Sequence, residues 1–153
     1  METAGIVAEY NPFHRGHAWH IAETRRRLGG DAPVVCVMSG HWVQRGECAL
    51  ADKWLRAALA LDRGADLVVE LPTPWAMASA ESFARGAVSL LAATGVVDVL
   101  SFGSETGELA PLEAAAEDVG VDPTRYYTVE TLAKAFLETC DRTRIEGFEP
   151  LFE

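Results

Sequence analysis

The chain has 153 residues, of which 49% are hydrophobic and 24% are charged. This composition suits one globular domain with a substantial core, and it excludes collagen-like, low-complexity and disordered chains. The sequence has no apolar run of about 18 residues, which a transmembrane helix needs. Its first residues lack the basic and apolar pattern of a signal peptide, so we expect no secretory leader. Three cysteines without a C-x-x-C pair favour a reducing compartment, so we expect a cytoplasmic protein with no membrane partner.

The net charge of −10 is unevenly spread along the chain. Nine of the thirteen Lys and Arg residues stand before residue 104, where the net charge is −2, against −8 from residue 104 onward. The acidic total argues against tight, non-specific nucleic-acid binding by this chain alone. It leaves room for a basic site in the first two thirds.

Apolar runs alternate with helical patterns as far as residue 102. The runs are short and mostly rich in valine and leucine, which predicts strands at 3–9, 33–38, 66–71 and 97–102. The stretches between them have helical spacing and are closed by glycine, which predicts helices at 14–28, 49–63 and 76–93. This order predicts an α/β fold: a Rossmann-like, doubly wound parallel sheet covered on both faces.

The pattern weakens beyond residue 103. Helices are expected at 109–119 and 128–140, and no fifth strand is evident. We therefore divide the chain into a sheet-forming part, 1–107, and a short, acidic, helical C-terminal segment, 108–153.

Ligands of such sheets bind beyond the carboxyl ends of the strands. Three segments of the chain are expected there: 9–17, 39–47 and 103–105. They are rich in Gly, His, Arg and Ser, which bind phosphate well.

The segment His14-Arg15-Gly16-His17 is the sharpest signal. It stands where the first helix begins, and a helix N-terminus offers N–H groups and a positive dipole end to an anion. Two imidazoles three residues apart project from one face of the first turn, and Gly16 lets a phosphate approach the backbone. His14 and His17 could therefore stabilise charge on an α-phosphate. The alternative is a pair of surface or capping histidines.

Several motifs in order resemble one family. They are Gly-Ile-Val-Ala-Glu-Tyr-Asn-Pro-Phe-His-Arg-Gly-His (5–17), Met-Ser-Gly-His-Trp-Val-Gln-Arg-Gly-Glu (38–47), Asp-Lys-Trp (52–54), Val-Glu-Leu-Pro (69–72), Ser-Ala-Glu-Ser-Phe-Ala-Arg-Gly-Ala-Val (79–88) and Phe-Gly-Ser-Glu (102–105). Over about residues 4–107 the chain resembles the bacterial tRNA(Met) cytidine acetate ligases, a branch of the HxGH nucleotidylyltransferase superfamily.

This resemblance implies an enzyme that activates acetate with ATP, expected with Mg²⁺, as acetyl-adenylate and releases pyrophosphate. The acetyl group then passes to N4 of the wobble cytidine of elongator tRNA(Met). His14 and His17 would be the catalytic residues, and 1–107 the ATP-binding domain. The implied ATP contacts are Ile6, Val7, Ala8, Glu9, Tyr10, Asn11, Pro12, Phe13, His14, Gly16, His17, His20, Gly103 and Ser104.

Some cations have two interpretations. Arg45 and Lys53 stand near the loop after the second strand, where they could contact phosphate or RNA, or remain solvated surface cations. Arg25, Arg26 and Arg27 end the first helix, where cations suit the negative dipole end; an RNA contact is the alternative. No cysteine or carboxylate stands at ligand spacing beside the histidines, so we expect no protein-held metal.

The family pattern is incomplete here. A second phosphate-binding segment of the Ser-x-x-x-Ile-Arg kind and a tRNA-holding C-terminal region are not found, and no family motif is evident from residue 108 onward. Two alternatives therefore stay open: an adenylyltransferase acting on a small phosphorylated metabolite, and a catalytically silent nucleotide-binding module.

Overall fold

A four-stranded sheet forms the centre of the computed structural model, which describes residues 1–103. Its strands are β1 (Ala4–Ala8), β2 (Val34–Ser39), β3 (Leu67–Leu71) and β4 (Val99–Ser101), and all are parallel in the order β3-β2-β1-β4. The helices between them are α1 (Arg15–Arg27), the short 3₁₀ turn η1 (Gln44–Gly46), α2 (Lys53–Asp62), α3 (Thr73–Ala76) and α4 (Ala80–Ala93). The predicted Rossmann-like α/β fold is confirmed.

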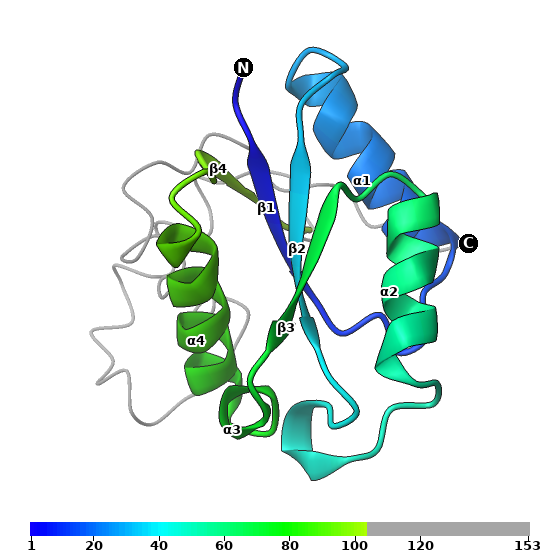
Figure 1. The fold of residues 1–153 in the computed structure, drawn as a ribbon, viewed down its shortest axis with the longest axis vertical. Coiled ribbons are helices and arrows are strands. Elements are labelled where there is room, and N and C mark those ends of the chain that lie inside the picture. The colour runs from blue at the N-terminus through cyan, green and yellow to red at the C-terminus, as the bar shows by residue number, and fades with distance from the viewer. Residues whose placement is uncertain (104–153) are drawn as a thin grey trace.

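Helices cover both faces of the sheet, as Figure 1 shows: α1 and α2 lie on one side and α4 on the other. Ile21 of α1 and Ala60 of α2 pack with Ile6, Val34 and Cys36 on the first face. The second core cluster joins α4 to residues of the opposite face of the strands, including Val35, Val37 and Leu100. Strand β3 forms an edge of the sheet, and its first residue, Leu67, is 46% exposed.

Two predicted helices have different bounds in the structure. The helix expected from residue 49 begins at Lys53, because the Asp52 side chain caps it by accepting from the Leu55 N–H at 2.9 Å. The helix expected from residue 76 begins instead at Ala80, where Ser79 caps it, and the separate short helix α3 ends at Ala76. The helices expected at 109–119 and 128–140 lie outside the described residues, as do Ser104 and the segment 108–153.

Close packing on the α4 face needs a glycine in the central strand. A Cβ atom added at Gly5 would lie 2.9 Å from the side chains of Leu91 and Val97, so a larger residue there would force these side chains to shift. The same strand continues into the loop that follows Ala8, and this loop shapes the candidate site.

Candidate nucleotide-binding site

A cavity of about 320 Å³ opens at the carboxyl end of β1. Its lining comes from the end of that strand, the following loop and the first turns of α1: Ile6, Val7, Ala8, Glu9, Tyr10, Asn11, Pro12, His14, His17 and His20. The structure thus brings together ten of the fourteen residues for which the sequence implied ATP contacts. The topology explains this, because ligands of parallel sheets bind where strands end and crossover helices begin.

The remaining four residues lie elsewhere or outside the description. Phe13 packs its ring against Tyr10 and His17, with ring centroids 4.8 Å and 5.5 Å apart. Gly16 lies in the first turn of α1, and Gly103 is exposed just past β4. Ser104 is not among the described residues.

His14 and His17 form a reciprocal cap at the start of α1. The His14 Nδ1 atom accepts from the Gly16 N–H at 3.1 Å, and the His17 Nδ1 atom accepts from the His14 N–H at 3.2 Å. Because each Nδ1 is an acceptor, each neutral ring carries its proton on Nε2. The capping interpretation and the ligand interpretation are therefore compatible: the cap orients the rings, and each keeps an Nε2–H donor.

The two rings stack, with centroids 3.7 Å apart and planes 24° apart. Burial, followed by the neighbouring His14, lowers the pKa of His17 to about 4. Burial, followed by His17, likewise lowers the pKa of His20 to about 4. Both side chains are therefore neutral near pH 7, where they act as hydrogen-bond donors or acceptors without carrying a charge.

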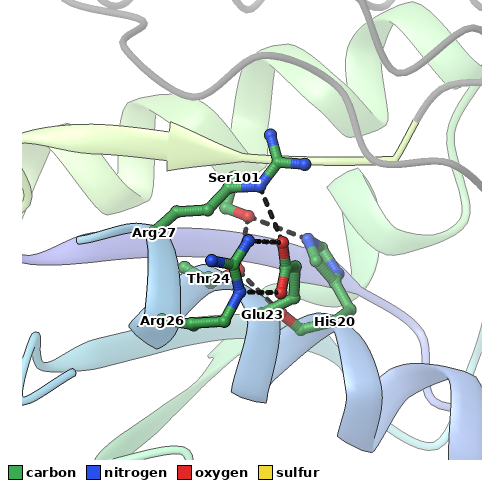
Figure 2. Close-up of polar contacts among 6 residues, drawn as sticks. All are labelled: His20, Glu23, Thr24, Arg26, Arg27 and Ser101. Atoms are coloured by element: carbon green, nitrogen blue, oxygen red, sulfur yellow. Dashed lines mark hydrogen bonds and ion pairs between the residues drawn. The ribbon is translucent and has the colours of Figure 1, made fainter. Parts of the chain in front are cut away.

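A closed ring of hydrogen bonds holds His20 (Figure 2). The Thr24 hydroxyl donates to the His20 carbonyl oxygen at 2.8 Å, so it must accept from the Ser101 hydroxyl at 2.7 Å. The Ser101 oxygen then accepts from His20 Nε2 at 2.8 Å. The directions fix the His20 tautomer, with the proton on Nε2. These hydrogen bonds link His20, in the cavity lining, to β4, where Ser101 is buried.

Tyr10 anchors the loop after β1. Its φ is 49°, in the left-handed region that few residues with a side chain adopt, and its side chain is buried. The ring meets His17 edge to face at a centroid distance of 4.9 Å, and its hydroxyl lies 3.3 Å from the Cys36 sulfur. Burial raises the pKa of Tyr10, and it raises the pKa of the Cys36 thiol to about 11, so both groups stay protonated near pH 7.

Loop residues from the second crossover brace this loop. The Glu9 carboxylate accepts from the Gln44 N–H at 2.7 Å, and the Asn11 side-chain oxygen accepts from the Leu50 N–H at 2.7 Å. Arg56 of α2 adds a bond to the Glu9 carbonyl oxygen at 2.5 Å. The shape of the cavity wall therefore depends on residues more than thirty positions away in the sequence.

The sequence analysis did not identify three of these supporting residues: Thr24, Arg56 and Ser101. A weak signal existed for Arg56, which stands four residues before the buried Ala60 and so shares its helix face. Ser101 is a serine at the end of an apolar strand. This pattern only indicates that the strand ends there, so it did not predict a supporting role.

Four of the cations that the sequence analysis singled out, Lys53 and Arg25 to Arg27, have intramolecular partners. Lys53 pairs with Glu70 at 2.6 Å and lies 5.2 Å from the centre of the Trp54 ring. Arg25 bonds Asp66 and the Gly64 carbonyl oxygen. Figure 2 shows Arg26 and Arg27 both joined to Glu23. These contacts favour structural roles for the three arginines. Arg45 lies in η1, and its side chain is outside the described part.

Residues 1–103 show neither a metal-binding cluster nor a membrane-spanning helix. No group of three or more His, Cys, Asp and Glu side chains within this range could hold a metal ion. Within the same range no helix is long and apolar enough to cross a bilayer.

The chain resembles curated proteins named tRNA(Met) cytidine acetate ligase. It is 50% identical to the one from Acetivibrio thermocellus over 126 residues, which is 82% of this chain and 30% of that protein. It is 53% identical to the one from Alkaliphilus metalliredigens over 116 residues, covering 76% of this chain and 27% of that protein. The chain thus spans about 30% of the length of the curated relatives it matches.

The chain is also similar to solved structures. The crystal structure of Thermotoga maritima TmcAL bound with alpha-thio ATP matches with a TM-score of 0.73 and 44% identity, covering 82% of this chain and 30% of that one. The resemblance predicted from the sequence motifs is confirmed. A family model described as HIGH Nucleotidyl Transferase matches residues 1–138, beyond the limit of 107 drawn from motifs alone. The chain belongs to the HIGH nucleotidyl transferase family.

Proposed function

We propose that this chain is the ATP-binding and acetate-activating part of a tRNA(Met) cytidine acetate ligase. The observation that carries the proposal is the cavity at the start of α1, lined by His14, His17 and His20. The alpha-thio ATP bound by the similar Thermotoga maritima protein supports a nucleotide as its occupant. Residues 1–107 would form the nucleotide-binding unit, followed in the chain by the acidic segment 108–153.

The chemistry needs no protein nucleophile. An acetate oxygen attacks the α-phosphorus of ATP, the bond from that phosphorus to the bridging oxygen breaks, and pyrophosphate leaves with acetyl-adenylate formed. The N4 amine of the wobble cytidine then attacks the acetyl carbon, loses a proton and releases AMP. Positioning and electrostatic stabilisation would supply most of the rate.

Neutral imidazoles suit this role. With their Nδ1 atoms occupied by the cap, His14 and His17 each offer an Nε2–H to an anionic oxygen at the positive end of α1. The loop after β1, Gly16 and Gly103 would surround the rest of the nucleotide. Lys53 would reach phosphate or RNA only after leaving Glu70, so we assign it a lesser part than the histidines. Arg45 remains a candidate for the same contacts.

Magnesium would enter with ATP. Among the described lining residues Glu9 supplies a carboxylate, and Mg²⁺ in such sites is held mainly by phosphate oxygens, water and one or two carboxylates. Elongator tRNA(Met) and acetate would be the other partners, and the cytoplasm the place of action.

Acetate-dependent exchange of labelled pyrophosphate into ATP tests the proposal. We expect exchange that requires acetate and does not require a phosphorylated metabolite, which separates the ligase from an adenylyltransferase of small phosphorylated acceptors. A rise in melting temperature with ATP but no exchange in the folded chain would leave a catalytically silent nucleotide-binding module. The absence of any ATP effect would overturn nucleotide binding itself.

A further inference from the structure

Arg56 is a fully buried charged side chain with 0% exposure. It belongs to the first turns of α2, a helix in which Trp54, Leu55 and Leu59 are exposed. Burial of a guanidinium is unfavourable unless its donors are paired, so the position implies specific partners. Burial lowers the pKa of Arg56, and the charges of Glu9, Asp52 and Glu70 act against that change.

The partners are three backbone carbonyl oxygens from three segments. Nε donates to Ala51 at 3.0 Å, one Nη donates to Glu9 at 2.5 Å, and the other Nη donates to Gly40. Glu9 directly follows β1, and Gly40 directly follows β2. Arg56 therefore joins the carboxyl ends of two neighbouring strands to the start of α2.

One of these segments lines the candidate site, and a second is hydrogen-bonded to it. Glu9 lines the cavity, and the loop that begins with it also supplies Tyr10, Asn11 and Pro12. Gly40 begins the loop whose Gln44 and Leu50 N–H groups bond the side chains of Glu9 and Asn11. A guanidinium can bond three carbonyls in different directions, whereas a lysine ammonium concentrates its donors on one atom.

We propose that Arg56 is a positioning residue for the nucleotide pocket, holding the loop after β1 in its binding shape through the Glu9 and Gly40 carbonyl oxygens. This inference rests on the proposed function for the identity of the ligand. The position of the loop after β1 is a property of the ligand-free chain, so it can be tested separately from ATP binding.

The ligand-free test is amide hydrogen exchange in the 153-residue chain. In the wild-type protein the Gln44 and Leu50 amides should be as well protected as amides of β1, because they belong to the same bonded unit. Arg56→Lys should increase their exchange rates by at least about tenfold. The matched control is Leu91→Ala, which truncates a buried side chain on the α4 face and should leave these two amides protected relative to β1.

The ligand test is the ATP dissociation constant, measured by calorimetry well below the melting temperature of each variant. Arg56→Lys should weaken ATP binding at least about tenfold, whereas Leu91→Ala should change it less than about twofold even when it lowers the melting temperature more. In the exchange assay, Arg56→Lys should raise the KM for ATP more than it lowers kcat.

Rapid exchange of Gln44 and Leu50 in the wild-type chain would overturn the inference, even if Arg56→Lys failed to fold. Equal loss of ATP affinity in Arg56→Lys and Leu91→Ala would also overturn it, because Arg56 would then contribute only general stability. A wild-type chain with protected loop amides and no ATP binding would refute the proposed function and leave the bracing of the loop in place.

Discussion

The two faces of the sheet are built from different chemistry. The α4 face is an aliphatic and aromatic cluster of residues such as Val37, Ala84 and Leu91. The face under α1 and α2 mixes apolar side chains with the buried polar groups of Thr24 and Arg56. Buried polar groups are stable only when they are paired, and here their partners are the loops and strand ends around the cavity. One face therefore mainly stabilises the fold, and the other also shapes the site.

The largest expected effect tests the α4 face. Leu91→Ala removes a buried side chain that packs against the position of Gly5, so it should lower the free energy of unfolding by about 2–5 kcal/mol. ATP affinity should stay within about twofold, since no cavity-lining side chain is changed. Urea unfolding followed by circular dichroism, together with calorimetry, measures both quantities. A large loss of ATP affinity would remove the distinction between the faces.

The second prediction concerns His17, on the other face. His17→Ala should lower the rate of acetate-dependent pyrophosphate exchange about 10²-fold, the loss usual for one electrostatic donor at a reacting centre. The matched variant is His17→Gln, whose side chain can still accept from the His14 N–H in a capping box. We expect His17→Gln to retain stability and lose exchange. Full exchange in His17→Gln would show that only the cap matters.

The third prediction uses the pH dependence of stability to test the buried histidines of α1. The pKa values of His17 and His20 fall from 6.5 in the unfolded chain to about 4 in the folded protein. Between these values the unfolded chain binds more protons, so the stability is fully present above about pH 6.5 and is lost as the pH falls toward 4. At about 1.4 kcal/mol per unit of pKa shift, the loss amounts to a few kcal/mol, most of it from the more deeply buried His20, because solvent screening reduces the share of the less buried His17.

Urea unfolding at about pH 7, 6 and 5 measures this loss. His20→Gln should flatten the dependence, because the substituted group does not titrate. Leu91→Ala should shift the whole curve downward without changing its slope. An unchanged slope in His20→Gln would mean that His20 is not held neutral in the folded protein.

The smallest expected effect concerns the ring of hydrogen bonds around His20. Ser101→Ala removes the central hydroxyl and leaves the His20 Nε2–H without this partner, which should cost about 1–3 kcal/mol of stability. ATP affinity should fall a few-fold, because the His20 ring loses its orientation. Thermal unfolding and calorimetry measure the two effects. Unchanged ATP affinity would show that these hydrogen bonds stabilise the fold and do not affect nucleotide binding.

Strand and helix types were predictable because the strands are apolar runs between helical periods and because glycines mark the helix ends. The helix boundaries were less predictable. The helix expected from residue 76 begins at Ala80, because Ser79 caps its start within an apolar stretch. The location of the two histidines at the cavity was predictable, because they directly follow the first strand and its loop. That these histidines also cap α1 depends on backbone angles that the motif does not specify.

The amino-acid sequence alone determined the α/β class, the end of the sheet that carries the cavity, and the chemical types that line it, because these follow from local periodicity and from residues adjacent in the chain. Only the tertiary structure decided which distant groups support that lining. Arg56 meets Glu9 and Gly40, and Ser101 meets His20 and Thr24, across separations of 16 to 81 residues. Such contacts arise from the order in which parallel strands assemble, so they depend on chain topology rather than on local sequence pattern.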